Sequence, residues 1–509
     1  MTNVELLLYL SLGLWVAGAR PRPREWSPAH WAALAWAAVL AVSAAAAPEH
    51  RGEAAKFALR QIGGVALFFA AADLSSAPRR AAILAVSYAG GAVASGLGGI
   101  AEAAWPAAAE ALLRFKTQPS LLEGGLRASG TLQYANLAAM CWGMALPLTT
   151  VLIAARRGRA WRLATGVGVL VLAEALVLSA SRAGLATALL VLAAIAASAR
   201  GRLGELRGPA LLALASLAAL AGVDLATRGG LAPGRRDRAW FDAEFRAEAP
   251  ALLEAGGAVS VPLRARNLGR LRWRASGEHG ISVGYVWLTD PAGSMQVAAP
   301  LPRDVEPGET VVVEARVAAP RAAGRHRLRW LLTGGGLAWV SPRAGAATDM
   351  DVEVGPTTRS PSPRAEDPVA LLLPQRQSTR PELWRAGLVL WKERPLFGVG
   401  PDNFRRLYAG TMGPHRLDER AHANSLYVEV LATLGLFGAS SLVALGAALT
   451  LGAARALRSE HPSARIVSAG AAGGLAAFFI HGLVDYGLEA TAVYGAFWLL
   501  AALVGPRRV

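Results

Sequence analysis

The residues best suited to chemistry in this sequence form the segment Ser181-Arg182-Ala183-Gly184, which interrupts two apolar runs. Residues 165–180 precede this segment and residues 185–199 follow it. An arginine at the border of a membrane is costly to place, so such a residue is by default a candidate for function. The chemistry open to Arg182 is that of a permanent positive charge held at the end of a span.

Apolar runs are the elements that must position this arginine. The chain has 509 residues, of which 53% are hydrophobic and only 17% are charged, and its mean hydropathy is +0.35. A soluble protein of this length would carry more charge and would not repeat apolar runs of about 20 residues. We predict eleven spans, near 4–19, 29–47, 57–74, 81–98, 133–154, 164–180, 185–199, 209–226, 430–452, 466–482 and 487–504. The first run lacks a basic segment before it and a small-residue cleavage site, so a cleaved signal peptide is not expected.

The positive charges predict how the spans are oriented. The formal net charge is +16, and arginines concentrate in alternate short loops. These arginines are Arg20, Arg22 and Arg24; Arg79 and Arg80; Arg156, Arg157, Arg159 and Arg162; Arg200, Arg202 and Arg207; Arg455 and Arg458; and Arg507 and Arg508. Short basic loops stay on the cytoplasmic side, so the N-terminus is expected outside and the C-terminus inside. Topology and contact with anionic membrane lipids explain the charge without a nucleic-acid partner.

The composition changes after residue 226. Residues 227–379 contain no apolar span and are expected in the periplasm. Apolar and polar residues alternate along four stretches, at 259–265, 281–287, 311–317 and 326–332. Alternation of this kind predicts a compact β-sandwich near 245–356, with Trp287 and Trp330 in its core.

The fold class predicted from these patterns is a mainly α, polytopic membrane protein of about eleven spans with an inserted periplasmic β-sandwich. Its predicted domains are a membrane domain at 1–226, the insertion at 227–379 with a linker at 357–379, and a C-terminal segment at 380–509 with about three spans. The lone cysteine, Cys141, excludes an internal disulfide framework.

Several segments on the predicted outer face share an order and spacing. They are Arg127-Ala128-Ser129-Gly130-Thr131-Leu132-Gln133-Tyr134-Ala135-Asn136, the segment containing Arg182, Arg380-Pro381-Glu382-Leu383-Trp384 with Pro395–Phe404, Ala421-His422-Ala423-Asn424-Ser425-Leu426-Tyr427 with Leu434-Gly435-Leu436-Phe437-Gly438, and His481–Tyr486. Together they resemble the O-antigen ligase and polymerase superfamily of bacterial envelope glycosyltransferases, over about 75–500 apart from the insertion. The insertion resembles immunoglobulin-like modules attached to bacterial surface-glycan enzymes.

This resemblance implies a multi-pass enzyme of the bacterial inner membrane with its active site facing the periplasm. It would transfer a glycan from a polyprenyl-pyrophosphate carrier to an acceptor, without a metal or another cofactor. Arg182 and Arg380 match the family's functional arginines. They would grip the pyrophosphate, whose charge grows as the glycosidic bond breaks. The first expectation is an O-antigen ligase with the lipid A core as acceptor; a polymerase acting on a second carrier-linked glycan and a protein O-glycosyltransferase stay open.

The sequence departs from the family at the expected proton acceptor. Family ligases place a histidine eleven residues before the first glycine of a Gly-x-x-Gly pair, and here Asn424 holds that position before Gly435. His422 lies two residues earlier and could reach the site from a loop. Alternatively, Asn424 orients the acceptor while Glu429 or a group of the acceptor takes the proton.

Arg182, Arg380, His422 and Asn424 are therefore the predicted catalytic residues. Four further residues in the matched segments are predicted to bind substrate: Arg127, Asn136, Ser181 and Ser425.

Simpler interpretations stand beside these. Arg182 could be a snorkelling side chain at a helix end, and Arg380 an ordinary linker arginine. His481 and Asp485 are four residues apart and are expected to form a structural pair. A function of another class is a non-catalytic glycan-binding or export protein whose working part is the β module. In an enzyme, Arg182, Arg380 and the 422–425 segment should converge in one periplasmic cavity.

Overall fold

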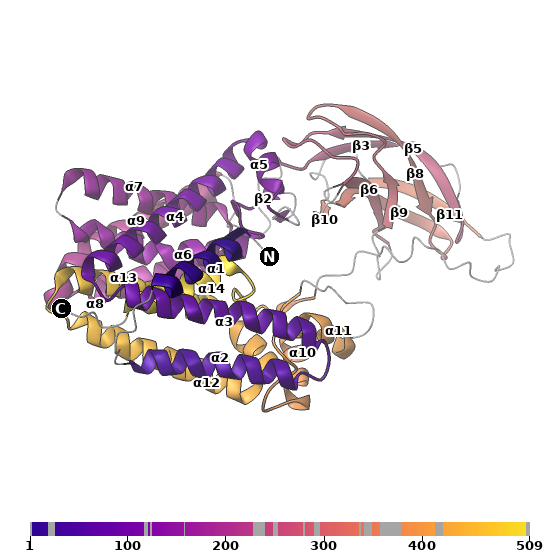
Figure 1. Cartoon of the computed structure of the whole chain (residues 1–509). Helices are drawn as coiled ribbons and strands as arrows, with labels where there is room; N and C mark the ends of the chain where they lie inside the picture. The colour runs from indigo at the N-terminus through magenta and orange to yellow at the C-terminus, as the bar shows by residue number, and fades with distance from the viewer. Residues whose placement is uncertain are drawn as a thin grey trace. The chain divides into compact units, whose positions relative to one another are not determined.

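The computed structural model describes residues 3–18, 26–116, 121–122, 125–156, 158–227, 240–247, 253–277, 280–289, 296–334, 337–340, 349–356, 378–412 and 421–504. The chain forms two compact units, a helical one and a β-rich one (Figure 1). The helical unit comprises residues 1–100, 136–222 and 376–509. The β-rich unit comprises residues 101–135 and 223–375, so it includes a segment that lies far from the insertion in sequence.

Apolar helices follow the predicted spans closely. Among the described residues, eight are long and apolar enough to cross a membrane: α2 (Pro28–Ala46), α3 (Arg51–Leu74), α4 (Pro78–Ala104), α6 (Ala135–Leu152) with the 3₁₀ turn Ile153–Ala155, α7 (Arg159–Leu178), α9 (Arg207–Thr227) after the 3₁₀ turn Gly201–Leu206, α12 (Leu426–Leu457) and α13 (Pro462–His481). Three shorter apolar helices occupy the remaining predicted positions: α1 (Asn3–Gly18), α8 (Arg182–Ser198) and α14 (Thr491–Val504). The prediction of a polytopic helical membrane protein with an inserted β domain is confirmed.

Glycines allow the helices of this unit to pack closely. A Cβ atom at Gly474 of α13 would lie 2.4 Å from the carbonyl oxygen of Met144 in α6. A Cβ at Gly64 of α3 would lie 2.6 Å from the indole of Trp498 in α14. Small residues at such crossings bring helix backbones together where lipid provides no hydrophobic driving force between helices.

Helix α12 is broken at Gly435, where φ is +64° and ψ is −158°. Four backbone groups beside the break would be left without partners, which is costly at membrane depth. The segment 395–400 fills the break. The N–H groups of Leu436 and Phe437 donate to Pro395 and Leu396 at 2.8 and 3.2 Å.

The same segment also serves the other side of the break. The N–H groups of Val399 and Gly400 donate to the carbonyls of Ala432 and Thr433, both at 3.0 Å. Ser43 of α2 adds hydroxyl bonds to the carbonyls of Phe397 and Thr433 at 2.7 and 3.0 Å. The loop is therefore spliced into α12 and fixes the first half of the helix against α2, which lies beside α12 in Figure 1.

Two short helices, α10 (Arg380–Glu393) and α11 (Phe404–Met412), flank the spliced loop. Leu383, Ala386 and Leu390 of α10 share a buried cluster with Phe404 and Tyr408 of α11. That cluster also contains Val399 of the loop, Ala423 of the segment before α12, and Ala432 of α12. It holds α10, α11 and the start of α12 in one arrangement.

The β-rich unit is a sandwich of two sheets. The larger sheet has the order β4 (Leu253–Glu254), β11 (Asp349–Gly355), β9 (Gly324–Gly334), β6 (Ile281–Trp287) and β7 (Gln296–Pro300), with β10 (Leu337–Val340) also paired to β9. The smaller sheet has the order β3 (Ala243–Ala247), β5 (Ala258–Asn267) and β8 (Thr310–Ala318). All neighbouring strands are antiparallel except β4 and β11. The four predicted stretches lie within β5, β6, β8 and β9.

The two sheets share one apolar core. Leu263 of β5 and Val313 of β8 are paired in the smaller sheet, and Tyr285 of β6 is paired with Trp330 of β9 in the larger sheet. All four belong to a single buried cluster, as does Trp287. Both tryptophans predicted in the core are therefore there. The segment 101–135 contributes α5 (Pro106–Leu113) and a two-residue hairpin of β1 (Leu121–Leu122) and β2 (Gly125–Leu126).

Candidate functional site

The segment leading into α12 places His422 between two carboxylates. Its Nδ1 lies 3.1 Å from Oε1 of Glu429, and its Nε2 lies 2.7 Å from Oε2 of Glu489. The other oxygen of Glu429 accepts the N–H of Ala423 at 2.7 Å. The ring of Tyr486 packs against the imidazole, with 5.0 Å between ring centroids. We call His422, Glu429, Tyr486 and Glu489 the histidine cluster.

The charge of His422 follows from these contacts. Burial alone would lower the pKa of His422, but attraction to Glu489 and Glu429 outweighs burial and raises that pKa well above its usual value. The imidazole is therefore protonated at neutral pH, and each ring N–H donates to a carboxylate. A ring in this state has no lone pair with which to accept a proton, so the geometry favours His422 as a fixed cation.

Further charged groups surround Tyr486. Burial, and then Glu429, Asp402 and Glu489, raise the pKa of the Tyr486 phenol well above its usual range, against the opposing charge of Arg60. Arg60 of α3 is itself held by Glu5 of α1, with 2.6 Å between Nε and Oε1. The cluster thus lies among acidic and basic groups from several helices.

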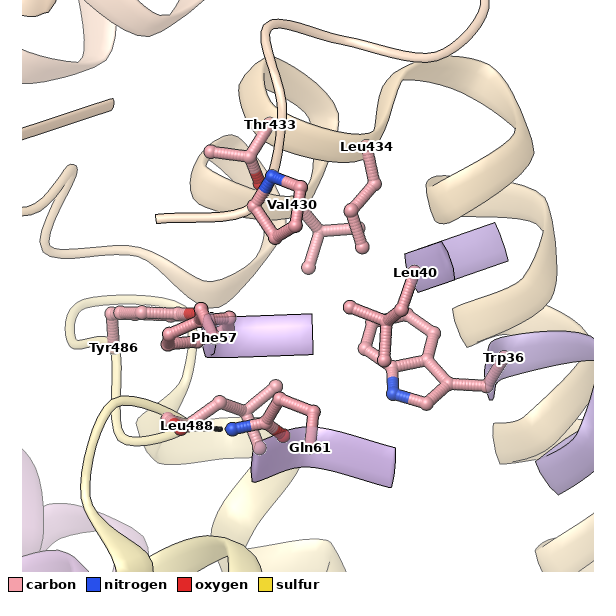
Figure 2. Close-up of a pocket in the computed structure, with 10 residues that line it drawn as sticks. Trp36, Leu40, Phe57, Gln61, Val430, Thr433, Leu434, Tyr486 and Leu488 are labelled. Carbon is pink, nitrogen blue, oxygen red and sulfur yellow. Dashed lines mark hydrogen bonds between the residues drawn. The ribbon is translucent and has the colours of Figure 1, made fainter. Parts of the chain in front are cut away.

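A small apolar pocket lies next to the cluster (Figure 2). Its lining residues come from α2, α3, α12 and two loops: Trp36, Leu40, Phe57, Gln61, Pro401, Val430, Thr433, Leu434, Tyr486 and Leu488. The amide of Gln61 donates to the carbonyl of Leu488 at 2.5 Å, which ties α3 to the loop that carries Tyr486 and Glu489. The polar side chains in this lining are those of Gln61, Thr433 and Tyr486.

Arg380 is the first residue of α10, and its side chain is exposed. Thr379 caps the helix, because Glu382 accepts both its N–H and its hydroxyl at 2.8 and 2.9 Å. The charge of Arg380 acts on the imidazole of His481 at the end of α13. That end adjoins the start of α12, where the N–H of Leu426 donates to the carbonyl of Gly482 at 2.7 Å. Arg380 and the 421–425 segment therefore lie at the same end of the α12–α13 pair.

Arg182 begins α8 after a tight turn from α7, and its side chain is exposed. Ala180 takes the left-handed conformation in that turn, with φ of +49°. The hydroxyl of Ser181, predicted to bind substrate, accepts the N–H of Gly184 at 3.3 Å and so caps the helix. The N-terminal end of a helix dipole is positive and favours anions. Arg182 and Arg380 each add a side-chain cation at such an end, so both positions suit an anionic ligand.

The other predicted residues occupy defined positions. Asn424 has a left-handed backbone, with φ of +49°, and Ser425 is the buried N-cap residue of α12. Asn136 lies in the first turn of α6 in the helical unit. Nε2 of His481 and Oδ2 of Asp485 lie 4.0 Å apart, so the two residues expected to pair are neighbours.

Arg127 lies in the β-rich unit, just before a buried acidic site. Glu102 pairs with Lys116 and also accepts the N–H groups of Ser129 and Gly130 at 2.9 and 2.7 Å. These bonds fix the backbone that follows Arg127. Burial lowers the pKa of Lys116, and the pairing with Glu102 opposes that shift.

Comparison with known protein families finds a matching region in this chain. Residues 372–443, which include α10, α11 and the first half of α12, match the family model described as O-antigen ligase. This match supports the resemblance to the O-antigen ligase superfamily that the sequence segments predict. The comparison with curated proteins gives no match. Among solved structures, the CARDB domain of a Pyrococcus furiosus protein, determined by NMR in solution, is similar at 14% identity and a TM-score of 0.17, and the match covers 23% of this chain and 95% of that chain.

The match supports glycan transfer of the O-antigen ligase type, and both partners of the splice lie inside residues 372–443. Sequence reasoning missed Glu489, which lies three residues beyond the last segment that carried the resemblance. Its signal was a carboxylate in a nine-residue loop between two spans, at 482–490. Nothing in the sequence of α1 or α3 indicated that Glu5 and Arg60 would meet.

Proposed function

We propose that this chain transfers a glycan from a polyprenyl-pyrophosphate carrier to an acceptor hydroxyl at the periplasmic face of a bacterial inner membrane. The lipid A core is the proposed acceptor. The observation that carries the proposal is the match at 372–443 together with the histidine cluster and Arg380, all at one end of the α12–α13 pair. The arginine-rich loops on the other side of the helices support the periplasmic orientation.

On the donor side, Arg182 and Arg380 would grip the pyrophosphate. Both are exposed, and both lie at helix N-termini, where the helix dipole favours anions. The pyrophosphate gains charge as the bond to the sugar breaks, so fixed cations stabilise the transition state more than the ground state. Arg127 and Asn136 are proposed to assist in binding, and no metal or other cofactor enters this scheme.

On the acceptor side, the 422–425 segment would position the hydroxyl. The amide of Asn424 can both donate to and accept from a sugar hydroxyl. His422 would supply positive charge close to the transferred glycan, and Ser181 and Ser425 would shape the site as helix caps. The β-sandwich, an immunoglobulin-like module in this proposal, would guide the choice of acceptor. The domain bounds 1–226, 227–379 and 380–509 belong to the same proposal, as does contact with membrane lipids and not with nucleic acid.

A specific observation supports one other function. Asn424 stands where family ligases have histidine, and His422 holds no lone pair for a proton. A chain without a base would be a glycan-binding or export protein. The exposed arginines at two helix starts favour the enzyme.

The test is the surface-glycan profile of a deletion strain complemented with wild type, Arg182→Ala or Arg380→Ala at matched membrane levels. The proposal predicts that glycan stays on its lipid carrier in the deletion strain and in both variants. The acceptor that then lacks glycan separates ligase, polymerase and protein glycosyltransferase. An unchanged profile in a deletion strain without a paralogue would contradict the proposal.

A further inference from the structure

Within the histidine cluster, Glu429, His422 and Glu489 form a chain of three ionisable groups with a buried end and an accessible end. The side chain of Glu429 is 1% exposed, that of His422 is 7% exposed, and that of Glu489 is 22% exposed. Glu429 is occupied on both oxygens, by His422 and by the N–H of Ala423. Glu489 is therefore the member of the chain that a substrate can reach.

The other polar groups nearby are poorly suited to accept a proton. His422 is a cation with both ring N–H groups donated to carboxylates. The carboxylate of Asp402 is already paired with Arg405 through two bonds, at 3.0 and 2.7 Å. The amide of Asn424 is not a base. A carboxylate oriented by a buried histidine and a second carboxylate has the arrangement of a general base with its supporting groups.

We infer that Glu489 is the catalytic base of the transfer reaction and that His422 and Glu429 are its positioning residues. This inference rests on the proposed function. The acceptor hydroxyl oxygen forms a bond to the anomeric carbon, whose bond to the pyrophosphate oxygen breaks, and polyprenyl pyrophosphate leaves with that electron pair. The hydroxyl proton passes to a carboxylate oxygen of Glu489 and then to water, so no oxidant, reductant or metal is consumed.

The electrostatic surroundings of Glu489 determine how its role depends on pH. His422 faces it from the 421–425 segment, Tyr486 and Asp485 lie on its own loop, Glu429 faces it from α12, and Arg60 and Asp402 act on the same region from α3 and the 401–403 turn. His422 and Arg60 place positive charge near the Glu489 carboxylate, and Glu429 and Asp402 place negative charge there. A general base acts in its charged form, so activity should fall on acidification.

The test compares Glu489→Gln, Glu489→Asp and Glu489→Ala with a matched control, Glu49→Gln. Glu49 is an acidic residue of the helical unit with a side chain that is 67% exposed, in the turn between α2 and α3. Each purified full-length variant is assayed with polyprenyl-pyrophosphate-linked glycan and the acceptor that the deletion strain identifies. Binding of the carrier-linked donor is measured in parallel.

Loss of a general base predicts that Glu489→Gln lowers kcat by about 10²- to 10⁴-fold, while donor affinity changes by less than about threefold. The acidic limb of the pH–rate profile should disappear in Glu489→Gln, Glu489→Asp should keep part of the activity, and added formate should restore activity to Glu489→Ala. A purely structural role would give none of these three signatures. Glu49→Gln should behave as wild type.

The inference is overturned if Glu489→Gln elutes as a folded protein in size-exclusion chromatography and yet retains kcat within about threefold of wild type or keeps the acidic limb. In that case the wild-type transfer still supports the proposed function. If wild type itself transfers no glycan, the proposed function and the assignment of Glu489 fall together.

Discussion

Replacing Gly435 with alanine should disrupt the splice that builds the site. Gly435 has φ of +64° and ψ of −158°, a region that only glycine adopts readily. A Cβ atom there would lie 2.4 Å from the carbonyl carbon and oxygen of Leu396. The inserted loop cannot keep its place beside this atom, so its four backbone bonds to α12 would be strained or lost.

The loss of stability in Gly435→Ala has two contributions, backbone strain and lost hydrogen bonds. The backbone strain costs about 1–3 kcal/mol, and loss of four hydrogen bonds at about 1 kcal/mol each adds to it in part. We therefore expect destabilisation between about 2 and 6 kcal/mol. Gly446→Ala is the matched control in the same helix, because its Cβ would meet only the ring of Phe479 at 3.8 Å. Alanine at that position should stabilise the helix by up to about 1 kcal/mol.

The assay is thermal unfolding of the two variants and wild type in the same detergent, followed by loss of the monodisperse peak in size-exclusion chromatography. Gly435→Ala should melt well below wild type and Gly446→Ala at or above it. Equal melting temperatures for the two variants would refute the account of the spliced loop.

Three other predictions concern stability. The folded-state pKa of His422 is raised above its unfolded value of about 6.5. The stabilisation that its charge gives is therefore complete below about pH 6.5 and is lost as pH rises through the raised folded-state pKa. The difference in melting temperature between wild type and His422→Gln should shrink towards alkaline pH, and a growing difference would contradict the pairing. Glu102→Gln leaves the fully buried ammonium of Lys116 without its carboxylate and should lower the free energy of unfolding by about 3–5 kcal/mol. Glu110 is half-buried, and Glu110→Gln should lower that free energy by less than about 1 kcal/mol. Similar losses for the two variants would argue against a buried pair. Ala180→Gly removes the strain of an alanine in the left-handed conformation and should stabilise the folded chain by about 1 kcal/mol. Ala183→Gly inside α8 should destabilise the folded chain by about as much. The opposite order of stabilities would show that the turn is not strained.

The spans and the sandwich could be predicted because both rest on local periodicity. Apolar runs of membrane length have few alternatives to a helix, and the predicted runs lie within one to six residues of the observed helix starts, as at 57–74 for α3 (Arg51–Leu74). The alternation around Leu263 and Tyr285 likewise sets which side chains enter the core. Burial of one face leaves strand register little freedom.

The splice at Gly435 could not be predicted, because it depends on contacts between segments about forty residues apart. Gly398, Gly400 and Gly435 all have positive φ, but a glycine in a sequence does not reveal which conformation it adopts. The hydropathy of residues 430–452 predicts one continuous helix, because hydropathy carries no information on the break at Gly435.

The candidate site divides in the same way. Residue type and family motif indicated Arg182, Arg380 and the 422–425 segment, and the structure adds where each lies in its helix. The pairing of His422 with Glu489 joins residues 67 positions apart, and only tertiary structure brings them together. The charge state of His422 follows from that pairing, so the sequence could not show that its lone pairs are unavailable.

The central claim is most directly tested by reconstituting the purified chain in lipid vesicles with a polyprenyl-pyrophosphate-linked glycan and the candidate acceptors. The account predicts that free polyprenyl pyrophosphate and glycosylated acceptor appear in equal amounts, and that Arg380→Ala lowers both together. Intact donor in the presence of a lipid A core, a second carrier-linked glycan and a protein acceptor would contradict it.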